Sequence, residues 1–221
     1  MAVLKTPRLT LRPGNPGDRA DFIALERDPE VMRFLNGGHA IDNEEGDPNA
    51  DFLMPRGTEP HVWTARRTIN EAFVGWFCLW PENKGSAELG YRLRRSDWGQ
   101  GLASEGALAL LNWGFESAGY ERIVGTTMAV NQASRRVMEK IGMKHASTVH
   151  VDFADPIPGS EHGEVWYELT RAEWHDLSSF NALIVRSNET PSNLDIYQPA
   201  TQKNPGTLPL IPASLICYPP I

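Results

Sequence analysis

The chain has 221 residues, of which 41% are hydrophobic and 22% charged, and these fractions are typical of a folded globular protein. This length suits one ordinary domain, or one domain with an appendage, and it buries a sizeable core without disulfides or metals. The formal net charge of -7 argues against a broad basic surface for nucleic acid or anionic membranes. We therefore expect neither partner, although a single loop can still bind an anion.

Cysteine usage and the first residues favour a cytoplasmic protein. The two cysteines, Cys78 and Cys217, make neither a disulfide framework nor a zinc cluster. Residues 1–12 are charged and lack the apolar stretch of a signal peptide. No uninterrupted apolar run is long enough to span a bilayer. The six histidines show no metal-ligand spacing, so we predict no metal.

The first part of the chain reads as a strand, two short helices and further strands. Leu9 and Leu11 alternate with polar neighbours, which predicts a strand. Apolar residues that start at Phe22 and at Val31 suit two short helices, the second with Pro29 in its first turn. We expect a long loop at 37–60, strands at 61–66, 73–79 and 87–93, and a turn at 81–85.

After residue 93 the period changes to that of a helix. Apolar spacing predicts helices over 103–114 and 133–141, which end at Gly119 and Gly142. Strands are expected at 123–128, 147–153 and 165–170, and Thr170 with Glu173 forms a capping box for a final short helix. Seven of the 17 prolines lie between Pro191 and Pro220. Because proline continues neither helices nor ladders, we expect a domain at 1–177 and an irregular tail at 178–221.

The segment Arg94-Arg-Ser-Asp-Trp-Gly-Gln-Gly-Leu-Ala-Ser-Glu105 lies between a predicted strand and a predicted helix. Gly99 and Gly101 let the backbone turn tightly, and the helix that follows offers unpaired N–H groups to a phosphate. A Walker loop is excluded because the segment has no lysine, and a Rossmann fingerprint fits poorly because Ser104 stands at its third glycine. A plain glycine turn before a capped helix is the alternative.

This segment and three others resemble the GNAT acetyltransferase superfamily. The others are Glu88-Leu-Gly-Tyr-Arg-Leu93, Glu121-Arg-Ile and Asn131-Gln-Ala-Ser-Arg-Arg-Val-Met-Glu-Lys-Ile-Gly-Met143. The similarity runs from about Thr6 to Trp174 and is strongest to the branch that includes the ribosomal-protein N-terminal acetyltransferases. It implies an α/β fold with a mixed, mostly antiparallel twisted sheet flanked by helices.

The resemblance also implies acetyl-CoA as the acyl donor, with its pyrophosphate on the backbone N–H groups of the glycine loop. The strand at 88–93 would run beside the pantetheine arm and polarise the thioester carbonyl. Asn131 matches the asparagine that hydrogen-bonds the CoA arm in the family. The residues expected to bind the donor are Tyr91, Leu93, Trp98, Gly99, Gln100, Gly101, Leu102, Ala103, Ser104, Asn131, Ser134 and Arg135.

Two side chains are the expected catalytic residues. Many members carry a tyrosine that protonates the leaving thiolate, but Met138 stands at that position, so Ser134 becomes the candidate acid. Glu88 resembles the family's general base, which would keep the attacking amine neutral. Asp152 and His150 are weaker candidates for the base. The amine would attack directly in a ternary complex, with no acyl-enzyme, and positioning would supply much of the rate.

Three functions stay open at this stage. The favoured one is N-acetylation of a protein N-terminus; the second is acetylation of a small amine, and the third is a catalytically silent acyl-CoA-binding module. An acidic stretch at 161–164, with Asp152 and Asp155, would attract a cationic acceptor, but we favour the simpler interpretation of a solvated loop. The expected partners are acetyl-CoA and a peptide or small-molecule amine, with a homodimer left open. The tryptophans at 63, 76, 80 and 98 are expected in the core, and Cys78 is expected to be buried.

Overall fold

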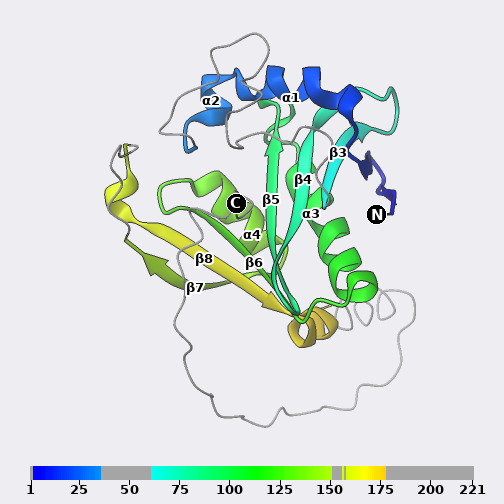
Figure 1. The fold of residues 1–221 in the computed structure, drawn as a ribbon. Helices are drawn as coiled ribbons and strands as arrows, with labels where there is room; N and C mark the ends of the chain where they lie inside the picture. Colours follow the sequence, from blue (N-terminus) through cyan, green and yellow to red (C-terminus); the bar gives the residue numbers. More distant parts are fainter. Residues whose placement is uncertain (1, 36–60, 151–155, 157, 178–221) are drawn as a thin grey trace, which may run out of the picture.

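The computed structural model describes residues 2–35, 61–150, 156 and 158–177. The described strands form one sheet of eight strands in the order β1-β2-β3-β4-β5-β6-β8-β7 (Figure 1). Within it β5 and β6 are parallel, and all other neighbouring strands are antiparallel, which confirms the predicted mixed sheet. The strands are β1 Leu4–Lys5, β2 Leu9–Pro13, β3 Val62–Arg67, β4 Phe73–Asn83, β5 Ser86–Leu93, β6 Arg122–Met128, β7 Lys144–Val149 and β8 Glu164–Thr170.

Helices cover both faces of this sheet. They are α1 Arg19–Glu26, α2 Pro29–Met32, α3 Leu102–Trp113 and α4 Gln132–Lys140, with a final helix at 171–177. Alternate residues of β4 divide the core, because successive strand residues point to opposite faces. Phe77 and Leu79 pack in the cluster that contains α3, whereas Trp76 and Cys78 pack in the cluster that contains α1. The prediction that Cys78 is buried is therefore confirmed.

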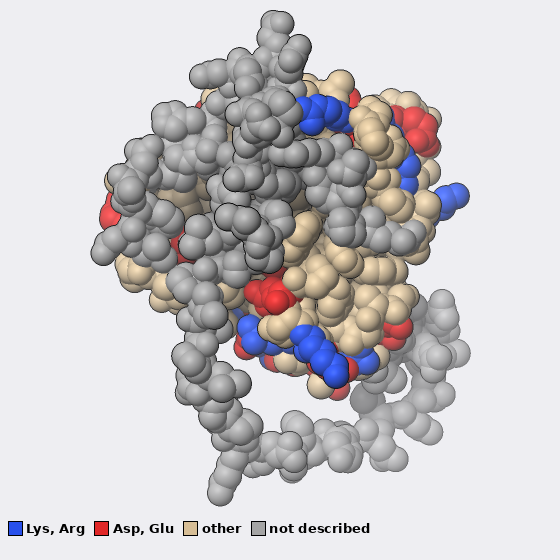
Figure 2. All heavy atoms as spheres, viewed as in Figure 1, with Lys and Arg blue, Asp and Glu red and all other residues tan. Residues whose placement is uncertain are grey.

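None of the helices in the described part of the chain is both long and apolar enough to cross a membrane. On the face of the molecule drawn in Figure 2, the described Lys and Arg side chains are scattered among Asp and Glu rather than gathered into one patch.

The sheet opens between its two central strands. The parallel pairing of β5 and β6 starts at Ser86 with Arg122 and ends at Glu88 with Val124. Beyond that pair the two strands separate (Figure 1), so the backbone groups of 89–93 that face β6 have no strand partner among the residues that the structure describes. The carboxyl ends of the separated strands lead to the N-termini of α3 and α4. The opening is thus bounded by two strands and two helix starts.

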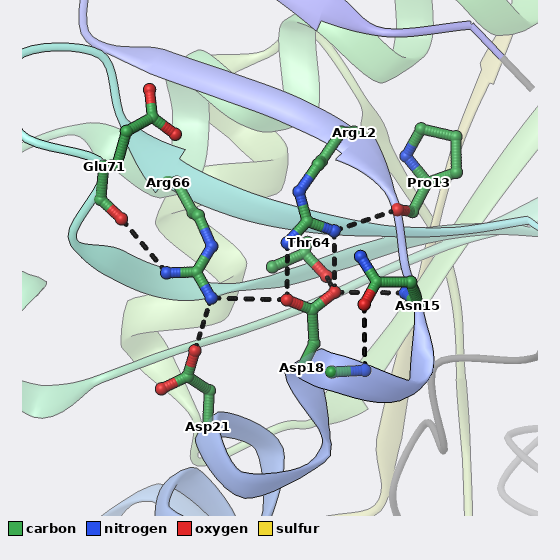
Figure 3. Close-up of polar contacts among 9 residues, drawn as sticks. Arg12, Pro13, Asn15, Asp18, Asp21, Thr64, Arg66 and Glu71 are labelled. Carbon is green, nitrogen blue, oxygen red and sulfur yellow. Dashed lines mark hydrogen bonds and ion pairs between the residues drawn. The ribbon is translucent and has the colours of Figure 1, made fainter.

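The buried carboxylate of Asp18, just before α1, forms hydrogen bonds with two strands of the sheet. Asp18, which is 1% exposed, accepts hydrogen bonds from both terminal guanidinium nitrogens of Arg12, at 2.7 and 2.6 Å, and from Thr64 Oγ1 at 2.7 Å (Figure 3). Arg66 bridges it to Asp21 on α1. Burial opposes ionisation of Asp18, but these hydrogen bonds outweigh it and lower the pKa to about 2. The cluster therefore ties the start of α1 to β2 and β3.

Most sequence-based element predictions are confirmed, with two corrections. The turn predicted at 81–85 is too long, because β4 continues to Asn83 and Pro81 pairs with Ala87 of β5. Proline is tolerated there because Pro81 lies beyond the end of β3, so its missing N–H faces no strand partner. The strand predicted at 147–153 begins instead at Lys144, directly after Gly142 turns the chain with a φ of 92°. The predicted loop at 37–60, residues 151–153 and the predicted tail at 178–221 lie outside the described residues.

Candidate active site

The glycine loop connects the carboxyl end of β5 to the N-terminus of α3. Gly99 and Gly101 have φ values of 71° and 77°, in the left-handed region that favours glycine. The backbone hydrogen bonds of α3 begin with Glu105 N to Gly101 O at 3.0 Å, so the N–H groups at the helix start have no helical acceptor. The side chains of Leu102 and Ser104 are buried in the protein, so these two residues can offer only their backbone N–H groups at the start of α3. The geometry is that of an anion site.

Basic side chains surround this loop, and the sequence analysis did not find them. The Arg8 guanidinium donates to Gln100 O at 2.8 Å and also binds Glu105. A Cβ at Gly101 would lie 3.6 Å from Arg8 Nη2 and 3.9 Å from Lys140 Nζ. Arg8 directly precedes β2 and Lys140 ends α4, so no local motif could show that both lie near Gly101. Both charges favour an anion at the loop.

The opposite wall of the opening is the start of α4. Asn131 caps this helix: its Oδ1 accepts from Ser134 N at 3.2 Å, and its Nδ2 donates to Thr127 Oγ1 at 3.0 Å. The Tyr91 hydroxyl reaches from β5 to within 3.0 Å of Ser134 Oγ. Burial raises the pKa of Tyr91 to about 12, although its bond to Ser134 works the other way. Strand β5 and the first turn of α4 are therefore linked through two hydroxyl groups.

Glu88 lies on the other face of β5, at the last paired position before the strands separate. It is 8% exposed, and its Oε1 accepts from Thr126 Oγ1 at 2.8 Å. Burial raises its pKa to about 7, and the nearby carboxylates Glu82 and Glu164 act in the same direction. A carboxyl group with a pKa near neutrality is suited to accept and release a proton.

The remaining predicted residues have varied positions. Leu93 lies at the end of β5 and its carbonyl accepts from Trp98 Nε1 at 2.8 Å. Trp98 is 46% exposed, so the expectation that it packs in the core is wrong; it lies on the loop, where its ring remains open to solvent. The side chain of Gln100 accepts from Arg67 at 2.7 Å and donates to Ser96 O.

Two further predictions concern α4 and the alternative bases. The Arg135 guanidinium donates to Tyr167 Oη at 3.2 Å and to Ala129 O at 3.0 Å, which holds it against β8 rather than over the glycine loop. Ala103 is partly buried against the main core. His150 is exposed directly after β7, and Asp152 lies outside the described residues.

The structure therefore brings the glycine loop, Tyr91 with Ser134, and Glu88 to one opening.

Comparison with known proteins shows the family to which the chain belongs. A family model of the acetyltransferase (GNAT) domain matches residues 8–144, which is more than half of the chain. A relative from Aspergillus fumigatus, named FsC-acetyl coenzyme A-N(2)-transacetylase, is 37% identical over 181 residues, which cover 77% of each chain. The chain therefore belongs to the GNAT acetyltransferase family.

Solved structures show the same fold. Spermidine N-acetyltransferase from Vibrio cholerae, in complex with CoA and spermine, has a TM-score of 0.62 and 15% identity, with 77% of this chain and 99% of that chain covered. The ribosomal L7/L12 alpha-N-protein acetyltransferase RimL, in complex with coenzyme A, has a TM-score of 0.61 and 18% identity, covering 76% and 98%. Acetyl-CoA, the donor expected from the sequence, agrees with this family. Among the described residues, no group of three or more His, Cys, Asp or Glu side chains could hold a metal.

Proposed function

We propose that this chain transfers the acetyl group of acetyl-CoA to a primary amine by direct attack in a ternary complex. The observation that carries the proposal is the opening beyond Glu88 and Val124, which leads to the glycine loop and is flanked by candidate proton-transfer groups on both faces of β5. The pyrophosphate would lie on the N–H groups of residues 99–104, beside Arg8 and Lys140. The pantetheine arm would then extend between β5 and β6.

Each side chain has a distinct role in this scheme. Glu88 accepts the proton that the amine nitrogen loses as it bonds to the thioester carbonyl carbon. The C–S bond then breaks, and the leaving thiolate accepts a hydrogen bond from the Ser134 hydroxyl, which the Tyr91 hydroxyl supports. The proton taken by Glu88 passes to solvent, and the thiolate takes a proton from solvent as CoA leaves. Because Met138 is buried and has no proton to donate, Ser134 is the proposed donor on α4.

The acceptor that we favour is a small-molecule amine. The support is the name of the Aspergillus fumigatus relative, an acetyl coenzyme A-N(2)-transacetylase that shares 37% identity. A protein N-terminus, the acceptor expected from the sequence, is the second candidate, supported by the same fold in RimL at 18% identity. Either acceptor carries the positive charge that the Glu82, Glu88 and Glu164 carboxylates attract.

A CoA-release assay with parallel panels of peptides and small amines tests the proposal. Release that depends on a small amine and saturates supports the favoured acceptor, and release with peptides alone supports the second candidate. Tight binding of acetyl-CoA without release by any amine would leave a silent acyl-CoA-binding module and refute the enzymatic function.

A further inference from the structure

A row of side chains crosses the sheet on the face that carries Glu88. Trp80 of β4 is in register with Glu88, and Glu88 is in register with Val124 of β6. Trp166 of β8 is opposite Thr126 and packs against Val124. Thr126 in turn donates to Glu88. Glu88 and Trp166 therefore lie on the same face of the sheet, on the two strands that flank β6.

Each of these two side chains has a buried polar atom to which no described residue forms a hydrogen bond. Glu88 is 8% exposed and Trp166 is 4% exposed. Among the described residues, neither Glu88 Oε2 nor Trp166 Nε1 has a hydrogen-bond partner. Leaving such an atom unpaired costs about 1–3 kcal/mol, so native proteins rarely retain one without a reason. Glu88 Oε2 can accept a hydrogen bond, and Trp166 Nε1 can donate one.

We propose that Glu88 and Trp166 together recognise an α-amino-acyl group on the acceptor. This inference rests on the proposed function and specifies its substrate class. The amine nitrogen binds Glu88 Oε2, and the carbonyl oxygen next to it accepts a hydrogen bond from Trp166 Nε1. The nitrogen and the carbonyl oxygen of such a group are about 3 Å apart by standard bond lengths, so one group can present its N–H to Glu88 and its oxygen to Trp166 from above β6.

Other amines satisfy this pair less well. A protonated polyamine has only donors, so it would fill Glu88 and leave the Trp166 N–H unpaired. A free amino acid would place its carboxylate close to the Glu82 and Glu164 carboxylates, which are near enough to Glu88 to raise its pKa. Amides and esters of amino acids, in a small molecule or at a peptide N-terminus, carry the amine and the neutral carbonyl that the site fits.

The decisive experiment compares alaninamide with isopropylamine, which has a methyl group in place of the carboxamide. We expect kcat/KM to be at least tenfold higher for alaninamide. Trp166→Phe removes the N–H and keeps an aromatic ring, and we expect it to lower kcat/KM for alaninamide about tenfold while isopropylamine changes less than twofold. Trp174→Phe, the same substitution on the helix at 171–177, where Trp174 stacks on Phe115, is the control and should change neither.

Binding without turnover separates this inference from the proposed function. In the CoA-bound protein, the indole N–H resonance that is lost in Trp166→Phe should shift on addition of alaninamide and stay in place with isopropylamine. A shift without CoA release would support recognition and refute the enzymatic function. Equal use of both amines, or an equal loss for both in Trp166→Phe, would overturn the inference while the acetyltransferase function stands.

Discussion

The Tyr91 hydroxyl lies 3.0 Å from Ser134 Oγ, so a strand and a helix that border the same opening meet through two hydroxyl groups. We expect Ser134→Ala to lower kcat about 100-fold with little change in acetyl-CoA affinity, because the thiolate loses its donor. Tyr91→Phe should lower kcat about tenfold, since Ser134 keeps its own hydroxyl. Steady-state kinetics and titration with acetyl-CoA measure the two effects separately.

The double variant tests whether the two hydroxyls act as a unit. Residues that act through one another are not additive, so Tyr91→Phe should add nothing to Ser134→Ala. Tyr120→Phe, on a tyrosine that packs near Gly114, is the control and should leave kcat unchanged. Full additivity of the two changes, or normal turnover by Ser134→Ala, would rule out the paired role.

The raised pKa of Glu88 predicts a specific pH profile. A base must be ionised, so kcat/KM should rise with pH and level off above an inflection near 7. Glu88→Gln should lower kcat/KM at least 100-fold and remove that inflection. Glu82→Gln is the matched control: it keeps the base but removes a negative charge that raises the pKa of Glu88, so the inflection should move to lower pH. An unchanged inflection in Glu88→Gln would assign the titration to another group.

A substitution at Gly101 tests the proposed anion site directly. Gly101→Glu places a negative charge at the start of α3 beside Arg8 and Lys140, and we expect acetyl-CoA binding to fall from the micromolar range, about -8 kcal/mol, by at least 100-fold. Gly119 has nearly the same backbone conformation, with a φ of 79°, and lies at the far end of the same helical segment. Gly119→Glu therefore reproduces the strain without the charge at the loop, and calorimetry should show near-normal affinity. Equal losses in both variants would indicate a general effect on folding.

Asp18 makes the fold sensitive to acid. Its folded-state pKa of about 2 is below the ordinary value of 3.8, so its ionised form stabilises the fold above pH 4, and this stabilisation is lost as the pH falls toward 2. Asp18→Asn should lower the free energy of unfolding by about 2 kcal/mol at pH 7, and by much less near pH 2. Asp21→Asn removes an exposed partner of Arg66 and should cost under about 0.5 kcal/mol. Urea unfolding at both pH values measures the differences.

Local signals in the sequence predicted the parts of the site that are local in the chain. Gly99 and Gly101 mark a left-handed loop before a helix, and Thr170 with Glu173 forms the predicted capping box, with Glu173 accepting from Thr170 N at 3.0 Å. Along β5, Leu89 and Leu93 pack in the main core while Glu88 and Arg92 lie on the opposite face, as the two-residue period of a strand requires. These features depend on residues only a few positions apart.

Contacts between distant residues escaped the sequence analysis. Arg8 and Lys140 meet at Gly101 although they are far apart in the chain, and Trp166 reaches the row of Glu88 only because β8 pairs with β6. Trp98 was misjudged for a related reason. Its bond to the Leu93 carbonyl holds the indole at the rim of the loop, whereas hydrophobicity alone predicts burial. Strand order determines which side chains share a site, and no single sequence motif predicts strand order.

The short parallel pairing between β5 and β6 has a consequence for the stability of the folded protein. Within the described residues, the strand pairing that joins β1–β5 to the β6-β8-β7 half runs only from Ser86 to Glu88. A donor molecule in the proposed position would contact the exposed backbone edge of β5 and the first turn of α4, as a further strand would. Acetyl-CoA at 100 times its Kd would then stabilise the folded state by about 2.7 kcal/mol and slow amide exchange in β6 and β8. Bound acetyl-CoA would in this way add contacts that hold the two halves of the sheet together.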